Sequence, residues 1–96
     1  MKAVVVTAKG DPSVLDARNI DAPEISSDNQ VLVKIAAAGV NPIDTKVRAG
    51  NLFGAEFPFI PGCDACGTVV ETGSAVTGFR PGDTVWYCHG GLGLAQ

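Results

Sequence analysis

The sequence has no cluster of basic residues and no long hydrophobic run. Its seven lysine and arginine residues are scattered singly among ten acidic ones, which leaves a net charge of −3. A nucleic-acid partner is therefore not expected, because binding a phosphate backbone takes a stripe of basic side chains. The longest apolar run, from Ile35 to Val40, is far shorter than the roughly 20 residues of a membrane span. No membrane partner is expected either.

Cysteine and histidine are also scarce, with three and one in 96 residues. An odd and low cysteine count does not suit a disulfide-stabilised secreted domain and favours a reducing compartment. The N-terminal residues lead directly into a β-branched run, and not into the apolar segment of a signal peptide. A cytoplasmic location is therefore expected.

Aromatic residues are few, whereas turn-forming residues are common. Six aromatic residues stand against 12 glycines and 6 prolines, a balance typical of turn-rich β structure. A chain of this length forms one domain, residues 1–96. A mainly β fold, a small and partly open β-barrel with one short helix, is expected. Its five strands are predicted at Lys2–Thr7, Val14–Ile20 (half-buried), Gln30–Gly39, Asp64–Thr72 and Asp83–Cys88.

One segment carries the signals of a short helix. Asn41 can cap it, Pro42 takes the first helical position and a glycine ends it, which predicts a helix from about Pro42 to Ala49. Asp44 and Arg48 would lie four residues apart on its surface. They are expected to form an exposed ion pair.

Cys63 and Cys66 form a C-x-x-C pattern, which is typical of zinc and redox sites. Zinc would need two further ligands, and the adjacent Cys88 and His89 have the wrong spacing for the second half of such a site. Because side chains alternate along a strand, Cys63 and Cys66 should also lie on opposite faces. Neither a shared zinc nor a redox pair is expected, and Cys66 is interpreted as a small core residue. His89 and the glycines after it are interpreted as loop residues, not as a general base and a phosphate-binding loop.

Three motifs in order along the chain carry a family resemblance: GVNPID at 39–44, PGCDACGTVV at 61–70 and GDTV at 82–85. Together they resemble the N-terminal GroES-like catalytic domain of the medium-chain dehydrogenase/reductase superfamily, and the match runs over nearly the whole chain. The resemblance implies that residues 1–96 are one GroES-like domain, truncated before its end. It also implies that the Rossmann cofactor domain is absent from this chain.

Within that superfamily, the zinc alcohol dehydrogenases differ from this sequence at their metal-binding positions. Asn41 stands where their first zinc cysteine would be, and Ile43 where their proton-relay hydroxyl would be. Cys63 and Asp64 stand where a His-Glu pair would be. The Asn-Pro-x-Asp motif is instead similar to the zinc-free quinone oxidoreductase branch, whose members reduce quinones or activated alkenes with NADPH. The resemblance therefore implies no metal site.

The resemblance also implies roles for individual residues. Asn41, Asp44 and Cys63 would be catalytic, with Asn41 orienting the nicotinamide or the substrate carbonyl by hydrogen bonding and Cys63 facing the cleft. Asn41, Lys46 and Arg48 would contact the cofactor. The family commonly has a tyrosine where Lys46 stands, so the substrate class stays open.

The implied function is that of the catalytic-domain portion of an NAD(P)H-dependent quinone or enone oxidoreductase, with NADPH or NADH as cofactor and no zinc. Its substrate would be a small-molecule carbonyl, quinone or enone, and the protein would form a homo-oligomer. The 96-residue chain alone would be inactive, because no dinucleotide-binding βαβ unit lies within it. Two alternatives stay open: a non-enzymatic GroES-like binding module, and a relative of the zinc alcohol dehydrogenases.

Overall fold

The computed structural model describes residues 1–50 and 56–88. All five predicted strands and the predicted helix are present, and no bound differs from its prediction by more than one residue. A short 3-10 turn, η1, precedes the second strand and was not predicted. The elements are β1 (Lys2–Val6), η1 (Pro12–Val14), β2 (Leu15–Asn19), β3 (Val31–Ala38), α1 (Pro42–Arg48), β4 (Asp64–Thr72) and β5 (Thr84–Cys88).

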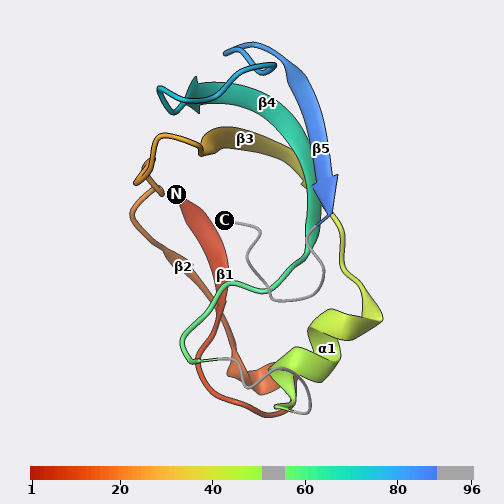
Figure 1. The fold of residues 1–96 in the computed structure, drawn as a ribbon. Helices are drawn as coiled ribbons and strands as arrows, with labels where there is room; N and C mark the ends of the chain where they lie inside the picture. The colour runs from red at the N-terminus through yellow and green to blue at the C-terminus, as the bar shows by residue number, and fades with distance from the viewer. Residues whose placement is uncertain (51–55, 89–96) are drawn as a thin grey trace.

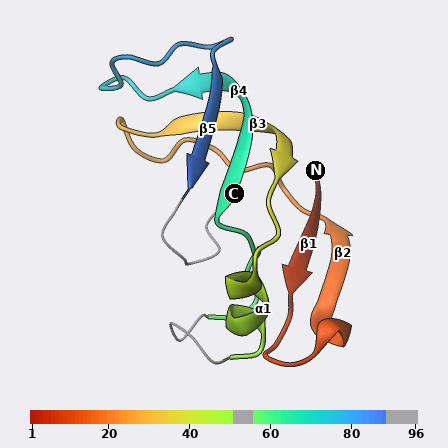
Figure 2. The same cartoon turned by 90° about the vertical axis from the view of Figure 1, so that its right-hand side faces the viewer.

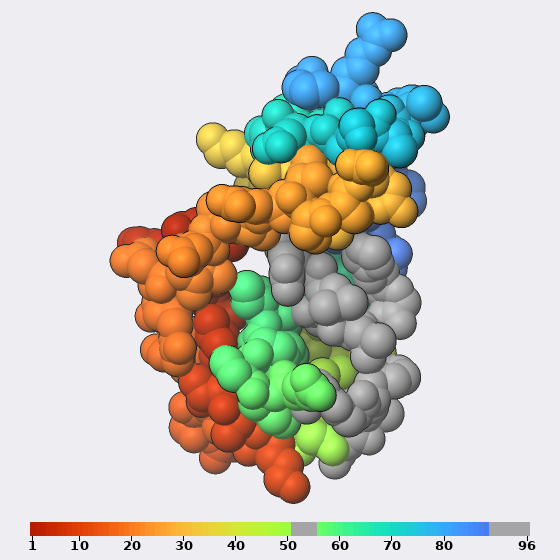
Figure 3. Space-filling model, turned by 60° about the vertical axis from the view of Figure 1, so that its left-hand side comes forward, coloured from red at the N-terminus to blue at the C-terminus, as the bar shows by residue number. Residues whose placement is uncertain are grey.

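The strands form two antiparallel sheets that do not close into a barrel. β1 pairs with β2 in one sheet, and β3, β4 and β5 form the other in that order (Figure 1). An isolated bridge links β1 to the segment before β4, where the Val6 N–H donates to the Phe59 carbonyl at 2.8 Å and the Phe59 N–H donates back at 3.1 Å. Figure 3 shows a hollow between the orange segment that follows β2 and the green segment that precedes β4. The partly open β-barrel is therefore confirmed.

The three-stranded sheet is curved, and its curvature has a local cause. The register between β3 and β4 shifts twice, once between Leu32 and Val33 and again between Ile35 and Ala37. Such bulges bend the strand that carries them. Gly67 lies opposite Ile35, and a Cβ at this position would overlap the backbone carbonyl oxygen of the residue before Ile35. The close approach of β3 and β4 therefore requires glycine there.

The core is small and is drawn from β1, α1 and the region of β4. Val6 and Val69 are the most buried, with 0% and 1% of their surface exposed. Because few apolar side chains are buried among the described residues, each contributes a large share of the buried area that stabilises the fold. The buried apolar residues are Val5, Val6, Val47, Cys63, Ala65 and Val69.

The alternating sequence of the second strand predicts that it is half-buried, and this prediction is wrong. All five residues of β2, Leu15–Asn19, are exposed. Among the described strands β2 pairs only with β1, so it forms one edge of a two-stranded sheet. The alternation of apolar and polar residues in β2 could not show whether another described element packs against this edge.

The predicted ion pair between Asp44 and Arg48 is also wrong. Arg48 Nε donates to the carbonyl of Gly10 at 3.1 Å, and the Gly10 N–H donates to the Arg48 carbonyl at 3.0 Å. These bonds tie the end of α1 to the turn after β1, and Figures 1 and 2 show the two segments side by side. Arg48 thus fixes the position of the helix relative to the first sheet.

No helix within residues 1–50 and 56–88 is long and apolar enough to cross a membrane.

Removing methyl groups from the core should destabilise the protein far more than removing them from the surface. Val69→Ala leaves a cavity at a position that is 1% exposed, and we expect it to lower the free energy of unfolding by about 2 kcal/mol. Val70→Ala is the matched control on the same strand, because Val70 is 47% exposed and should change it by less than about 0.5 kcal/mol. Urea denaturation of both variants measures the difference. Equal losses would show that β4 packs with the opposite face inward.

Candidate active site

Four polar side chains come together where α1 begins and β4 begins. Asn41 precedes the first residue of α1, whereas Cys63 and Asp64 lie at the start of β4, more than twenty positions later. Asn41 Nδ2 donates to Asp64 Oδ2 at 3.0 Å and lies 3.5 Å from Cys63 Sγ. Asp44 completes the group from the first turn of the helix. We refer to Asn41, Asp44, Cys63 and Asp64 as the polar cluster.

The start of α1 holds Asn41 by its backbone. Asn41 has the extended conformation of an N-cap residue, and Pro42 follows at the first helical position. The Asp44 carboxylate accepts a hydrogen bond from the Asn41 N–H at 2.8 Å, and the Asp44 N–H donates to the Asn41 carbonyl at 3.0 Å. An acidic residue in the first turn also interacts favourably with the helix dipole. The predicted N-cap position is therefore confirmed, while the amide nitrogen of Asn41 is directed to β4.

Gly39 sets the place of the Asp64 carboxylate. The Gly39 N–H donates to the Asp64 backbone carbonyl at 3.1 Å. A Cβ at position 39 would overlap the carboxylate of Asp64. The carboxylate therefore fills the space that any other residue at position 39 would need, and it is held next to Asn41.

Cys63 is a buried thiol with a raised pKa. Only 7% of its surface is exposed. Burial is the main cause that raises the pKa of Cys63, and the neighbouring carboxylates of Asp44 and Asp64 raise it further. The hydrogen bond from Asn41 acts in the opposite direction but does not reverse the shift. Cys63 is accordingly a neutral thiol at neutral pH, a poor nucleophile and a poor metal ligand.

The prediction that Cys63 and Cys66 lie on opposite faces is confirmed, but the inward face was assigned wrongly. Cys63 is buried and Cys66 is half-buried. Ala65 and Val69 are buried like Cys63, so the side chains at these odd-numbered positions face inward. Period-two alternation identifies two faces without showing which one other elements cover.

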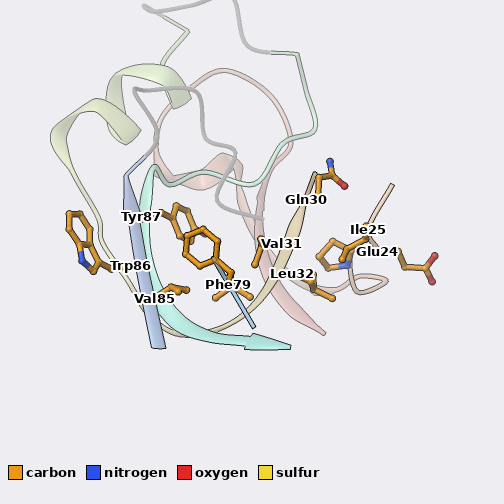
Figure 4. Close-up of a pocket in the computed structure, with 11 residues that line it drawn as sticks. Glu24, Ile25, Gln30, Val31, Leu32, Phe79, Val85, Trp86 and Tyr87 are labelled. Carbon is orange, nitrogen blue, oxygen red and sulfur yellow. The ribbon is translucent and has the colours of Figure 1, made fainter. Parts of the chain in front are cut away.

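A groove of about 480 Å³ lies beside the polar cluster on the outer side of the three-stranded sheet. Asp64 belongs to both the groove and the polar cluster. Cys66 and Trp86 are register partners on β4 and β5 and line the groove together. Trp86 is 80% exposed, and Figure 4 shows it pointing away from Tyr87 on the opposite side of β5.

A second cavity, of about 500 Å³, lies on the inner side of the sheet and contains no member of the polar cluster. It is lined mainly by apolar side chains of β3 and β5, with Phe79 and Tyr87 pointing into it (Figure 4). Burial raises the pKa of Tyr87. Among the described residues that line it, Glu24 is the one carboxylate. The polar cluster is the better candidate site, because there several polar groups converge on each other.

The structure brings together three of the five predicted site residues. Asn41, Asp44 and Cys63 are in the polar cluster, whereas Lys46 is exposed on α1. Arg48 lies at the other end of the helix, bonded to the turn after β1. Asp64 was not among the predicted site residues, although its place beside Cys63, where zinc relatives carry a glutamate, was a usable signal.

No three Cys, His, Asp or Glu side chains of the described residues are grouped closely enough to hold a metal ion. The alternative zinc site built from Cys63, Cys66, Cys88 and His89 includes a residue outside the described part of the chain, since His89 falls there together with the glycines that follow it. The absence of zinc stays a prediction.

The chain matches known proteins in sequence. Residues 27–94 match the family model of the alcohol dehydrogenase GroES-like domain. The chain is 38% identical over 87 residues to a quinone oxidoreductase of Lama guanicoe, covering 90% of this chain and 26% of that protein. It is 44% identical over 89 residues to the chloroplastic NADPH-dependent alkenal/one oxidoreductase of Arabidopsis thaliana, covering 90% of this chain and 23% of that protein. The chain thus spans about a quarter of the length of the curated relatives it matches.

The fold is similar to that of solved structures as well. The Escherichia coli quinone oxidoreductase complexed with NADPH superposes with a TM-score of 0.87 at 32% identity, over 96% of this chain and 28% of that chain.

Alkylation should reach Cys66 before Cys63. Cys63 is buried and its raised pKa leaves little thiolate at pH 8, so we expect it to react with iodoacetamide at least about tenfold more slowly than the half-buried Cys66. Fragmentation of the alkylated chain in a mass spectrometer assigns the label to each cysteine. Raising the pH should accelerate the reaction of Cys63, because its thiolate forms only above the raised pKa. Faster labelling of Cys63 at pH 8 would contradict the assigned strand faces.

Proposed function

This chain belongs to the alcohol dehydrogenase GroES-like domain family, and we propose that it is the catalytic-domain portion of an NAD(P)H-dependent quinone or enone oxidoreductase. The observation that carries the proposal is the polar cluster. An amide, a neutral thiol and a carboxylate stand where the zinc alcohol dehydrogenases carry a cysteine and a His-Glu pair, and the amide is bonded to both of the others. The relatives named quinone oxidoreductase and alkenal/one oxidoreductase support the same reaction class.

The residues fit the nicotinamide end of a reduced dinucleotide, which supplies the hydride when it is bound. Asn41 offers an uncharged amide, and the raised pKa of Cys63 keeps the thiol beside it neutral. Asp44 holds the backbone of Asn41 and acts on the ligand through it. These groups are proposed to position and orient the nicotinamide.

Lys46 and Arg48 are proposed to contact more distant parts of the cofactor. Lys46 is exposed on α1 and carries a flexible cation. Arg48 uses its Nε for the turn after β1, so only the terminal nitrogens of its guanidinium are left for a phosphate or ribose. Their contribution is proposed to be smaller than that of Asn41.

The dinucleotide-binding unit is proposed to lie in the part of the relatives that residues 1–96 do not match. The proposed substrate is a small quinone, enone or other carbonyl compound. We refer to a protein that would contain both this chain and the dinucleotide-binding unit as the parent protein. The homo-oligomeric state expected from the resemblance is proposed for it. The cytoplasmic location stays a prediction, because one of the compared relatives is chloroplastic.

Two other functions give different experimental outcomes. A zinc alcohol dehydrogenase relative would bind one metal per chain. A non-enzymatic binding module would leave the parent protein without any NADPH-dependent turnover of quinones or enones.

The purified protein should contain no stoichiometric zinc. Asn41 is a poor zinc ligand and the Cys63 thiol is neutral at neutral pH. Elemental analysis by mass spectrometry after dialysis measures the content, with a Cys63→Ala variant as the control for any metal at this position. One tightly bound zinc per chain, lost in Cys63→Ala, would favour the alcohol dehydrogenase alternative.

The chain alone should neither bind NADPH with micromolar affinity nor reduce quinones. Pyrophosphate binding needs a glycine-rich turn that feeds a helix in a βαβ unit, and the described residues contain only antiparallel sheets. Without that remote binding energy, hydride transfer loses a positioning contribution of roughly 7 to 11 kcal/mol. Calorimetric titration of NADPH into the chain tests the first expectation, and loss of absorbance at 340 nm with benzoquinone tests the second.

The parent protein is the positive control for both measurements. It should bind NADPH and oxidise it in the presence of a quinone or an enone. A parent that binds NADPH but turns over neither substrate would contradict the proposed reaction, and micromolar binding by the chain alone would contradict the division of the site between two domains.

A further inference from the structure

Asp64 stands beside Asn41 with no role assigned to it in the proposed reaction. We propose that Asp64, seated against Gly39, is a positioning residue that orients the Asn41 amide so that its oxygen is the atom left to accept a hydrogen bond from the nicotinamide carboxamide. The inference rests on the proposed function for its ligand, but its first half concerns contacts within this chain. This proposal replaces the expectation that Asn41 could also orient a substrate carbonyl by donating a hydrogen bond to it.

The amide nitrogen of Asn41 has two hydrogens, and the protein uses both. One is donated to Asp64 Oδ2 at 3.0 Å, and the other faces Cys63 Sγ at 3.5 Å. An ionised carboxylate has only lone pairs to offer, so the atom of Asn41 that faces Asp64 has to be the nitrogen. No N–H of the Asn41 side chain is left to donate to a carbonyl oxygen of a ligand.

The Asp64 carboxylate cannot easily leave its position. It occupies the space where a side chain at position 39 would be, and the Gly39 N–H holds the Asp64 backbone at 3.1 Å. Asp64 is half-buried and is the first residue of β4, paired with β5. A charged acceptor held this firmly imposes one orientation on the amide beside it.

The backbone of Asn41 is fixed from the opposite side. The Asp44 carboxylate accepts from the Asn41 N–H at 2.8 Å, so the residue is held by one carboxylate at its main chain and by another at its side chain. The Asn41 side chain faces the Asp44 backbone N–H in a capping box, and its oxygen keeps acceptor capacity for a ligand because a carbonyl oxygen has two lone pairs.

An acceptor selects a ligand group that carries N–H or O–H. A quinone or an enone has only carbonyl oxygens at its reacting end, so this oxygen does not recognise the oxidised substrate. The carboxamide of nicotinamide carries an NH₂ group, which is the complementary donor. The site is therefore specific for the amide of the cofactor.

The internal half of the proposal is tested by nuclear magnetic resonance on this chain. Asp64→Asn keeps the shape of the side chain and lets the pair of amides exchange roles, while Gly39→Ala displaces the carboxylate without removing it. Both should shift the Asn41 side-chain amide resonances, which Asn41→Ala identifies, and should speed their hydrogen exchange several-fold. Asp28→Asn makes the same charge change at an exposed position and should leave them unchanged. The backbone spectrum reports whether each variant is folded.

The ligand half is tested in the parent enzyme with NADPH and its reduced 3-acetylpyridine analogue, in which a methyl group replaces the amide NH₂. The wild type should bind NADPH about tenfold more tightly than the analogue, as expected for one hydrogen bond. Asn41→Ala should abolish the preference, Asp64→Asn should reduce it several-fold, and Asp28→Asn should retain it.

Each result decides a different part. Asn41 amide resonances that do not respond to Asp64→Asn would overturn the positioning role of Asp64, whether or not the proposed function is right. An unchanged preference for the amide in Asn41→Ala would overturn the assigned ligand. A parent that binds neither nucleotide would refute the proposed function and with it the assigned ligand, while the resonance result would still decide the positioning role.

Discussion

The hydrogen bond between Asn41 and Asp64 joins the two segments on which the candidate site depends. At 3.0 Å it connects the residue before α1 to the first residue of β4, and the Cys63 thiol is enclosed beside it. The bond forms only because Gly39 leaves space for the carboxylate. Without it, the segment before α1 would be held to the start of β4 by the Gly39 backbone bond and by the weaker contact between the Asn41 amide and the Cys63 sulfur.

The same contacts bear on the kind of ligand that is proposed for this site. Two carboxylates flank Cys63 and, together with burial, raise its pKa, so the thiol carries no charge at neutral pH. The two carboxylates are in turn occupied by N–H donors from Asn41. An arrangement in which hydrogen-bonded carboxylates hold a neutral amide supports the proposed orientation of a nicotinamide ring, whereas a metal ion would need deprotonated ligands.

The elements of the fold were predictable because their signals are local. β-branched runs between turn residues mark all five strands, and Pro42 marks the first residue of α1. The errors concern packing. β2 is exposed because, among the described strands, it pairs with β1 alone, and its own sequence does not show this. Arg48 bonds to Gly10, which is 38 positions away and therefore outside the reach of the i,i+4 rule.

The sequence by itself determined the strands, the short helix, the family and three members of the polar cluster, because each follows from residues that are neighbours in the chain or from motifs in a fixed order. Only the tertiary structure decided which face of β4 is buried, that Cys63 is the enclosed thiol, and that Asp64 accepts a hydrogen bond from Asn41. These depend on how segments more than twenty residues apart meet. The direction of a side-chain amide is set by the donors and acceptors around it, and those come from different elements of the fold.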